Sequence, residues 1–438
     1  MTWRSQIAAA LTAAAIGGML PLFSSTPVRA LESTIELKIP DRRNWTPYAA
    51  SNGQFEIVVW VASTADGVSD LYAVTSNDSG ATFSAPRRVN DIPGDVRTGG
   101  EYAPEVAIGP QALHVAWMSS RDNKVALRVA KSTDRGQTFS PASTLHEEGL
   151  INGRGWQSIG LGPDGTLHAV WLDGRNDAAA AEHAGHNMAP AAGQPAAPAR
   201  PSMHGGYMDL FYGVLGGAAQ GTATRRLAAN TCQCCKTAMV IGPDGSINAA
   251  WRQIFGEDIR DIAFLRSEDG GKTFGTQVRV SEDKWQLNGC PDDGPTLAAD
   301  SRGGIHAAWP TLVVDGESQR IALFYAYSKD GRTFTPRVEV KNLGSLKPSH
   351  IQMTSRPDGR LALVWDELSD GVRKIVMATG ASAAGGAASL SSGQLVSDPA
   401  VTGTYPSVAP TPKGFLVAWT SGVAEASTIK VVHVSDRQ

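Results

Sequence analysis

The sequence predicts an all-β fold, a seven-bladed β-propeller, with six blades as the alternative count. Two observations predict it. A strand-like apolar segment ending in Trp recurs seven times along the 438 residues, and a Ser-x-Asp turn follows four of these segments. Recurrence at such a period is typical of repeat architectures, in which each unit buries its apolar faces against its neighbours.

The seven segments read FEIVVW, LHVAW, LHAVW, INAAW, IHAAW, LALVW and FLVAW. They end at Trp60, Trp117, Trp171, Trp251, Trp309, Trp365 and Trp419. Successive tryptophans are 57, 54, 80, 58, 56 and 54 residues apart. Apart from the third, these intervals suit four short strands with their turns, which is the size of a propeller blade.

The segment STIELKIP, residues 33–40, alternates apolar and polar residues and precedes the first repeat without a blade of its own. The seventh repeat ends before its own turn and outer strand. We therefore expect the N-terminal segment to pair with the last repeat, which closes the ring and covers two open sheet edges.

The turn reads SNDSGATF from Ser76, STDRGQTF from Ser132, SEDGGKTF from Ser267 and SKDGRTF from Ser328. It resembles the Asp-box, or BNR repeat, of the sialidase (neuraminidase) superfamily. The aspartates accept hydrogen bonds from turn amides, the glycines permit positive φ, and the final Phe packs between strands. We interpret the aspartates as structural because they recur around the ring: Asp78, Asp134, Asp269 and Asp330.

Residues 1–30 combine Arg4, an apolar run and small residues before Leu31, the pattern of a secretory signal peptide cut near Ala30. We expect an exported protein, periplasmic or secreted, whose residues 31–438 form one propeller domain. Cleavage changes the formal charge from −3 to −5. This mild acidity argues against nucleic acid as a partner, and no later segment is long enough for a membrane span. We expect a monomer.

The stretch NTCQCCKTAMV places Cys232, Cys234 and Cys235 together, and the fourth cysteine is Cys290. Cys232 and Cys290 each lie nineteen residues before a repeat Trp, so they occupy equivalent positions in adjacent blades. An oxidising compartment favours disulfides. We expect Cys290 to pair with Cys232 or Cys234. The leftover pair forms a second bridge, a vicinal Cys234–Cys235 ring, or stays as thiols.

Metal binding is the alternative for these cysteines. The long third interval holds an insertion at about 175–206, rich in Ala and Pro, which reads either as a solvated low-complexity loop or as a source of soft ligands. Its candidate ligands are His183, His186, Met188, Met203, His204 and Met208. Copper(I) is the cofactor that this set would suit; no other cofactor is indicated. We assign packing roles to His114, His168 and His306.

The resemblance to sialidases implies an arginine clamp for a carboxylate, a Tyr nucleophile with a Glu partner, and an Asp acid. Tyr405 is the nucleophile candidate, and Asp66 and Asp70 are the acid candidates. The ligand-binding candidates are Arg43, Arg97, Arg154, Arg252 and Asp292. The family's Phe-Arg-Ile-Pro motif is absent and no Glu partner is evident, so the catalytic set is incomplete.

The sequence therefore predicts an exported sialidase-like propeller that binds a carbohydrate or small polar ligand in its central funnel, with glycoside hydrolase activity left open. Trp45, Trp156 and Trp285 lie near funnel-side turns, where they either stack on sugar rings or pack inside the ring. The alternatives are a copper-binding exported protein and a non-catalytic interaction scaffold.

Overall fold

The structure is a computed structural model, and nearly all of its regular structure is β-strand. The prediction of an all-β fold is confirmed. The structure describes residues 33–99, 102–121, 124–146, 154–176, 208–215, 224–256, 258–287, 291, 293–345, 347–382 and 386–435. The expected signal peptide, almost all of the insertion at about 175–206, Asp292 and Cys290 lie outside the described residues. Among the described residues, no helix is long and apolar enough to cross a membrane.

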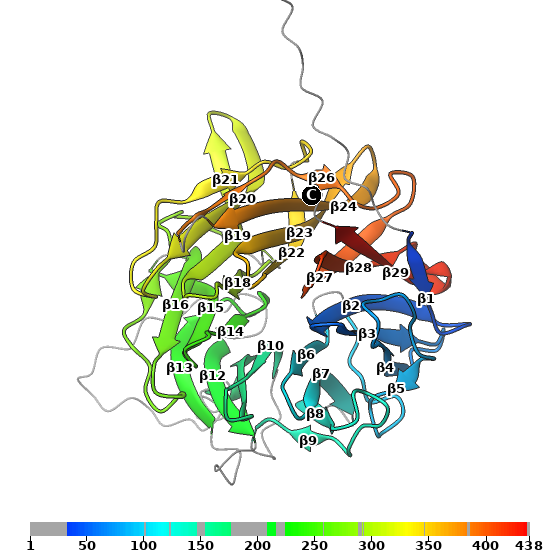
Figure 1. Cartoon of the computed structure of the whole chain (residues 1–438). Helices are drawn as coiled ribbons and strands as arrows, with labels where there is room; N and C mark the ends of the chain where they lie inside the picture. The colour runs from blue at the N-terminus through cyan, green and yellow to red at the C-terminus, as the bar shows by residue number, and fades with distance from the viewer. Residues whose placement is uncertain are drawn as a thin grey trace, which may run out of the picture.

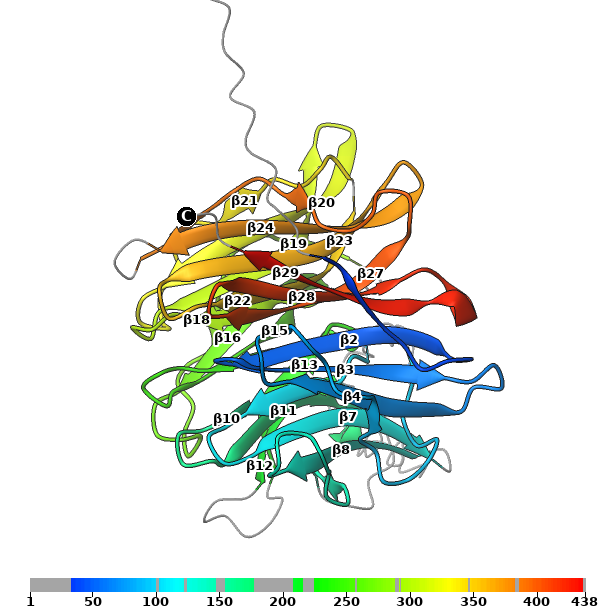
Figure 2. The same ribbon diagram turned by 45° about the vertical axis from the view of Figure 1, so that its right-hand side comes forward.

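Antiparallel sheets surround a common centre (Figures 1 and 2). The first sheet contains β2 (Arg43–Asn52), β3 (Phe55–Ser63), β4 (Ser69–Ser76) and β5 (Arg87–Arg88). The second contains β6 (Glu105–Ile108), β7 (Leu113–Arg121), β8 (Lys124–Ser132) and β9 (Ser143–Thr144). In each of them the chain runs outward from an innermost strand.

An eight-stranded sheet joins the third and fourth repeats. It contains β10 (Arg154–Leu161), β11 (Leu167–Asp173), β12 (Met208–Leu215), β13 (Thr224–Thr231), β14 (Ala238–Ile241), β15 (Ile247–Phe255), β16 (Ile259–Ser267) and β17 (Val278–Arg279). The join is a single antiparallel pair, Thr231 opposite Gln253, where the end of β13 reaches β15. The residues after β13 therefore lie against β15, the strand of the fourth repeat that contains Trp251.

The remaining sheets follow the same order. One contains β18 (Thr296–Ala299), β19 (Ile305–Asp315), β20 (Ser318–Ser328) and β21 (Val338–Val340). The next contains β22 (Pro348–Ser355), β23 (Arg360–Ser369), β24 (Val372–Ser382), β25 (Ala388–Leu390) and β26 (Gln394–Leu395). The last contains β27 (Gly403–Thr411), β28 (Gly414–Ser421), β29 (Thr428–Ser435) and β1 (Ile35–Leu37), with the 3-10 helix η1 (Ala424–Ala426) before β29.

The N-terminal strand β1 pairs antiparallel with β29, with Ile35 opposite Val431. Lys430 and Glu36 add an ion pair at 2.8 Å across this junction. The innermost strands also contact one another in sequence, from β2 through β6, β10, β14, β18 and β22 to β27, and β27 contacts β2. The first and last strands of the described chain are therefore paired within one sheet.

The repeated tryptophans form the packing between sheets. All seven lie on the second strand of their repeat, and each is at most 3% exposed. The apolar clusters run from one sheet into the next. In one of them, Val364 and Ile375 of the β22–β26 sheet pack with Val417 and Val432 of the last sheet. Because each cluster needs two sheets, the repeats stabilise one another.

The two ends of the ring differ, and we name them by what they carry. The turn of the first Asp-box lies beside the β2–β3 turn, since the Ser79 amide donates to the Gln54 carbonyl at 3.0 Å. We call this the box end. The opposite end, where the innermost strands begin and the second strands finish, is called the mouth end.

The Asp-boxes are self-contained turns. In the box of β16, Ser267 donates to Asp269 at 2.8 Å, and the Thr273 amide and hydroxyl donate to the same carboxylate at 2.9 and 2.6 Å. Hydrogen bonds led by the one from the Thr273 hydroxyl lower the pKa of Asp269 to about 2. Asp78, Asp134 and Asp330 accept from equivalent partners. These contacts use the carboxylates inside the turn.

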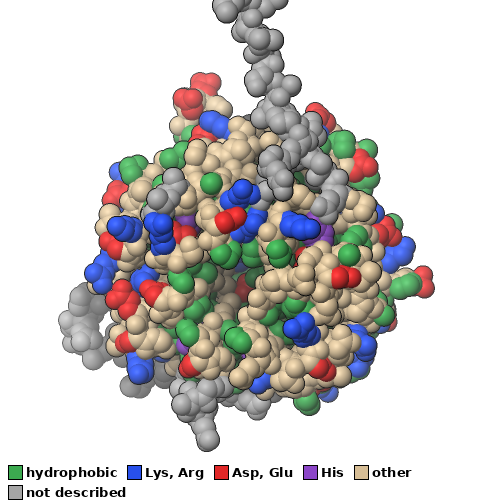
Figure 3. All heavy atoms as spheres, viewed as in Figure 1, with side chains coloured by type: hydrophobic (Ala, Val, Ile, Leu, Met, Phe, Trp, Pro, Cys, Tyr) green, Lys and Arg blue, Asp and Glu red, His purple; other side chains and the backbone are tan. Residues whose placement is uncertain are grey.

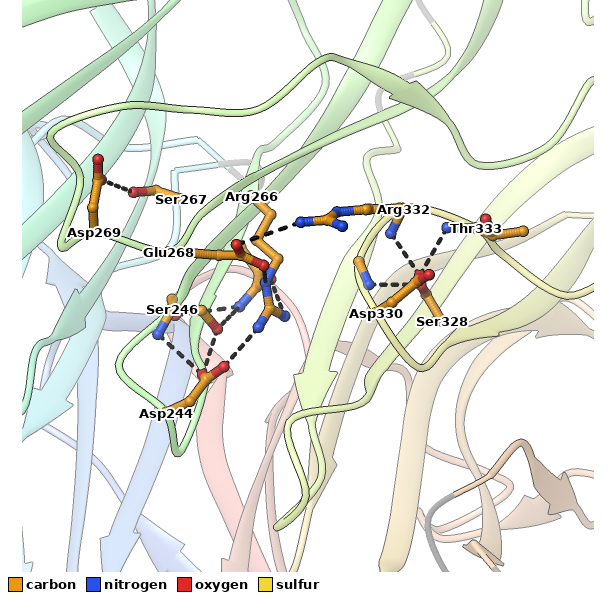
Figure 4. A network of polar contacts seen from close by, with 12 residues as sticks. Asp244, Ser246, Arg266, Ser267, Glu268, Asp269, Ser328, Asp330, Arg332 and Thr333 are labelled. Carbon is orange, nitrogen blue, oxygen red and sulfur yellow. Dashed lines mark hydrogen bonds and ion pairs between the residues drawn. The ribbon is translucent and has the colours of Figure 1, made fainter.

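An ionic chain joins two neighbouring boxes on the surface of the box end (Figure 4). Arg266 donates to Asp244 at 2.6 Å and contacts Glu268 at 3.3 Å, and Arg332 of the next sheet contacts Glu268 at 3.5 Å. Asp330 remains within its own turn with Ser328 and Thr333. The box end is therefore occupied by structural hydrogen bonds.

Candidate functional site

Four of the innermost strands are kinked at the mouth end. The register shifts by a bulge in β2, β10, β22 and β27. Each bulge holds one residue with positive φ, namely Thr46, Trp156, His350 and Tyr405, at φ values of 48°, 51°, 54° and 53°. Non-glycine residues in this conformation are costly and cluster at functional sites, and bulges re-aim side chains.

The bulges of β22 and β27 bring His350 and Tyr405 together. Their ring centroids lie 4.2 Å apart at an interplanar angle of 46°. His350 Nδ1 lies 2.6 Å from Asp366 Oδ2. Since this carboxylate accepts the Nδ1 proton, the lone pair of a neutral imidazole is on Nε2. The arrangement is an imidazole oriented by a buried carboxylate beside a phenol.

Asp366 holds this group in place from β23. Its side chain is fully buried, its Oδ1 pairs with Arg373 of β24, and its Oδ2 also accepts the Tyr405 amide at 2.9 Å. The residue comes directly after Trp365. A buried carboxylate needs partners on both oxygens, and here it receives them from three separate strands.

The residue after the Trp plays the same part in other sheets. Thr420, after Trp419, accepts the Thr46 amide at 2.9 Å. Arg252, after Trp251, donates from Nε to the Asp293 carbonyl at 3.1 Å and from Nη2 to the Pro310 carbonyl at 2.7 Å. These positions fasten one sheet to the next.

Arg252 therefore differs from the expected ligand clamp. It is 1% exposed, and its third donor, Nη1, bonds the Arg260 carbonyl at 2.8 Å. All three hydrogen-bonding nitrogens are used by the fold, and the guanidinium lies 4.9 Å from the Trp285 ring. Of the two roles left open for Trp285, sugar stacking and internal packing, the structure shows internal packing, because the buried ring faces Arg252.

The other predicted arginines do not converge with Arg252. Arg43 is exposed and covers the Trp45 ring at 4.0 Å. Arg97 lies 4.5 Å from the Tyr102 ring and donates to its hydroxyl at 3.1 Å. Arg154 begins β10, but its side chain is outside the described part of the structure, as is Asp292. The described side chains do not assemble a three-arginine clamp.

Neither aspartate predicted as the acid is placed for that work. Asp70 is 3% exposed and pairs with Arg42 at 2.9 Å. Burial alone would raise the pKa of Asp70, but hydrogen bonds from Asn90, Gly94 and Arg42 hold it below its ordinary value. A general acid needs a raised pKa. Asp66 is exposed on the β3–β4 turn and accepts a hydrogen bond from Thr64.

The centre of the ring holds a cavity of about 630 Å³. Figure 3 shows the molecule hollowed at this position. The lining includes Tyr48, Glu105, Ser158 and Lys236 and continues to Arg356 toward the box end. Among the described residues that line it, none was predicted as a site residue from the sequence, so the described part of the predicted site and the central cavity are separate features.

Glu105 and Asp300 are the acids among the described residues that line this cavity. Burial raises the pKa of Glu105 to about 7, against a hydrogen bond from the Ile159 amide at 2.8 Å and the charge of Lys236. Burial and the charge of Glu105 likewise raise the pKa of Tyr48. The sequence offered no signal for this residue, because EYAPEVAIG reads as an ordinary inner strand.

The cysteine cluster lies on the turn between β13 and β14. The sulfurs of Cys232, Cys234 and Cys235 all lie within 4.8 Å of one another. Cys232 and Cys235 are free and buried. The expected bridge from Cys232 to Cys290 and the vicinal Cys234–Cys235 ring are therefore not formed. Cys290 itself lies outside the described residues.

Of the expected soft-metal ligands on the insertion, the structure describes Met208, which begins β12 and accepts the Thr231 hydroxyl at its carbonyl. His183, His186, Met188, Met203 and His204 lie outside the described residues. Among the histidines expected to pack, His168 and His306 are buried and bond the hydroxyls of Tyr212 and Tyr325, both at 2.7 Å. His114 is also buried.

Sequence reasoning missed His350, Asp366 and Arg373. One signal was present: Asp366 directly follows a repeat Trp, and Arg252, which the sequence analysis did select, occupies the same position on the equivalent strand of another repeat. The bulge that turns His350 toward Tyr405 has no pattern in the sequence.

No family model matches this chain, and no curated protein matches it. Solved structures do. An ulvan lyase of polysaccharide lyase family PL25 is 11% identical over 92% of this chain and 96% of its own, with a TM-score of 0.53. The GH93 α-L-arabinofuranosidase of Fusarium graminearum, in complex with arabinobiose, is 13% identical over 92% and 98%, with a TM-score of 0.50. The Hadza microbial sialidase Hz136 is 15% identical over 84% and 74%, at 0.46.

The ulvan lyase and the arabinofuranosidase are β-propeller proteins of the glycosidase-like kind, at low identity. They show that this chain shares that fold. They do not assign it to the sialidases or to any one of these activities, because function depends on the site and not on the fold.

Proposed function

We propose that this protein is an exported seven-bladed propeller, closed by β1, that binds a carbohydrate at its mouth end around His350 and Tyr405. The seven innermost strands that contact one another in a cycle support the blade count. The β1–β29 pairing supports closure of the ring. The leader-like residues 1–30 support export, with 31–438 as the mature domain.

One observation carries the proposal: the His350 and Tyr405 rings lie 4.2 Å apart while Asp366 holds His350 Nδ1 at 2.6 Å. An imidazole with a fixed tautomer can take up a proton at Nε2, and a neighbouring phenol can donate one. Such a pair suits proton transfer to and from sugar hydroxyls and ring substituents. Tyr405 keeps its predicted place in the site, with His350 in place of the Glu partner that sialidases use.

The structural neighbours are consistent with this choice of ligand, since they include a polysaccharide lyase and an arabinofuranosidase bound to arabinobiose. On this proposal the protein is a carbohydrate-binding propeller. Whether it also cleaves its carbohydrate ligand is tested separately. A fluorogenic sialoside and a fluorogenic α-L-arabinofuranoside test turnover directly.

The deciding experiment is a glycan microarray with the full mature chain, followed by calorimetry on the best glycan. We expect His350→Gln and Tyr405→Phe each to weaken binding at least tenfold. The matched control is His433→Gln, because His433 also pairs with a buried carboxylate, Glu56, at 3.0 Å, but its box-end contact with Gly80 places it away from the mouth. No binding to any glycan, or equal losses in the His433 control, would refute the proposal.

A second candidate function is soft-metal binding by Cys232 and Cys235, the two free thiols of the cluster; the third sulfur, that of Cys234, lies within 4.8 Å of them but is disulfide-bonded. Copper(I) is the ion that the sulfur ligands would suit. Native mass spectrometry after exposure to copper(I) tests it: one bound ion in the wild type that is lost in Cys232→Ser supports the candidate. Unchanged mass removes it.

A further inference from the structure

Cys232 and Cys235 stand at the two ends of a Cys-x-x-Cys sequence. They lie on the turn between β13 and β14, where the Cys235 amide approaches the Cys232 carbonyl at 3.5 Å. Their sulfurs are 2.9 Å apart, and each residue is 1% exposed. The turn therefore brings two free thiols into direct contact inside the protein.

The sulfur separation distinguishes a redox pair from a metal site. Two thiolates on one tetrahedral ion, with metal–sulfur bonds of about 2.3 Å, lie about 3.8 Å apart. A disulfide bond is about 2.05 Å long. The observed 2.9 Å lies between them, so a metal would have to push the sulfurs apart, whereas a disulfide needs them to approach by less than about 1 Å.

Two buried guanidinium groups surround this pair. Arg260 is 5% exposed and donates from Nη1 to the Cys232 sulfur at 3.2 Å and from Nε to the Leu287 carbonyl at 2.8 Å. Arg252 is 1% exposed and donates only to carbonyls. Within the described part of the chain, no carboxylate oxygen lies within 4.0 Å of either guanidinium.

Buried charges without a counter-ion are strongly unfavourable. The Cys232 sulfur is the group that touches a guanidinium, and as a thiolate it would compensate part of this charge. Arg260 Nη1 donates to the Cys232 sulfur at 3.2 Å, whereas among the described contacts no guanidinium donates to the Cys235 sulfur. The two thiols are thus unequal.

We propose that Cys232 and Cys235 are a redox-active pair that exchanges electrons with small disulfides, with Cys232 as the attacking sulfur and Cys235 as the resolving one. The Cys232 thiolate attacks one sulfur of the small disulfide and releases the other half as a thiolate. The Cys235 sulfur then attacks Cys232, and the second half leaves. The Cys235 proton passes to that leaving thiolate, so two protein thiols are oxidised and one disulfide is reduced.

The surrounding charge sets the direction of this exchange. Forming the Cys232–Cys235 bond removes the thiolate and leaves the buried Arg260 guanidinium without the sulfur anion that it contacts. The reduced pair is therefore favoured, and its disulfide is an oxidant, since stabilising the reduced form of a dithiol makes its disulfide easier to reduce. Both sulfurs are buried, so we expect slow exchange that needs local opening, while the equilibrium position is unaffected by this barrier.

The experiment is a glutathione redox titration of the full mature chain. After long equilibration, free thiols are trapped by alkylation under denaturing acid-quenched conditions. Trypsin releases residues 227–236, which contain the three clustered cysteines, and fragmentation locates the label on each. We expect Cys232 and Cys235 to lose alkylation together in one transition, as a mutual disulfide.

Arg260→Met should raise the equilibrium constant for oxidation about tenfold, because the thiolate loses one neighbouring charge worth about one pKa unit. Arg260→Lys should stay closer to the wild type. The matched control is Arg225→Met in β13, since Arg225 donates to the carbonyls of Lys272 and Gly271 and touches no sulfur. Separate glutathione adducts on the two cysteines, or equal constants for the Met and Lys variants, would overturn the proposal.

A second measurement covers the case in which Arg260→Met does not fold. The thiolate absorbs in the ultraviolet, and we expect this absorbance in the native wild type at neutral pH. Cys232→Ser should abolish it and Cys235→Ser should keep it, because a hydroxyl can still donate to the Cys232 sulfur. Absence of the band in the wild type, or its loss in Cys235→Ser alone, contradicts the assignment.

Discussion

The main-chain amide of Tyr405 donates to Asp366 Oδ2 at 2.9 Å, although the two residues belong to different sheets. The same oxygen faces His350 Nδ1 at 2.6 Å. One buried carboxylate therefore fixes both the packing of two blades and the orientation of the candidate proton-transfer residue. The packing of the two sheets and the proposed ligand site therefore share this carboxylate.

Replacing Asp366 with Ala should lower the free energy of unfolding by about 3 to 5 kcal/mol, because Arg373 would keep its charge without its buried partner. Urea unfolding measures the change. Asp358→Ala is the control, since Asp358 is 43% exposed and its pairs with Arg356 and Arg360 lie at the surface. A decrease of less than about 1 kcal/mol in the free energy of unfolding of both variants would show that Asp366 does not stabilise the contact between the two sheets.

The stability of the protein should depend on Glu105 through pH. Its folded pKa, about 7, is above its ordinary value of 4.5, so the folded state binds the proton more tightly than the unfolded state. Its favourable contribution is complete below about pH 4.5 and is lost as the pH rises through about 7. The wild type therefore loses a contribution between pH 4.5 and pH 8 that Glu105→Gln does not lose. Over this range the free energy of unfolding of Glu105→Gln should rise by on the order of 3 kcal/mol relative to that of the wild type.

Denaturant unfolding at a series of pH values provides this comparison. Parallel curves for Glu105→Gln and the wild type would mean that Glu105 ionises in the folded protein as it does in the unfolded chain. The positive charge of Lys236 lowers the pKa of Glu105 toward its ordinary value. Lys236→Met should therefore make the free energy of unfolding depend more steeply on pH than in the wild type.

Adjacent glycines in the third Asp-box should respond differently to Ala. Gly270 and Gly271 have φ of 70° and 83°, so each substitution costs about 1 to 2 kcal/mol for the left-handed backbone. A Cβ at Gly270 meets nothing within 4 Å, whereas at Gly271 it would overlap the Tyr212 hydroxyl. Gly271→Ala should be the more destabilising by at least about 1 kcal/mol in thermal or urea unfolding. Equal losses would contradict the packing of Tyr212 under the box.

Substitution of two repeat tryptophans should distinguish the contribution of packing to stability from that of hydrogen bonding. Trp365 Nε1 donates to the buried Glu367 at 2.6 Å, while Trp117 Nε1 has no hydrogen-bond partner among the described residues. Trp365→Phe leaves a buried acceptor short of one donor, which costs about 1 to 3 kcal/mol more than the shared loss of volume. Trp117→Phe has only that shared loss. Urea unfolding of both variants tests the difference, and a larger loss for Trp117→Phe would refute it.

The sequence alone determined the all-β class, the position of the repeats and the turns between them. These features follow from local patterns: strands show alternation, turns show Asp and Gly, and a buried Trp recurs once per repeat. The N-terminal strand could also be foreseen, because the last repeat was visibly short of one strand. Such inferences need only neighbouring residues and their period.

The tertiary structure decided the candidate site. His350 and Tyr405 are 55 residues apart in the sequence and meet because bulges in two adjacent inner strands turn both side chains toward each other. Arg252 was predicted to bind ligand and is instead buried between sheets, and the structure selected free thiols at Cys232 and Cys235 from the alternatives that the sequence left open. A bulge, a burial and a sulfur–sulfur distance depend on how strands from different repeats pack, and no local sequence pattern specifies that packing.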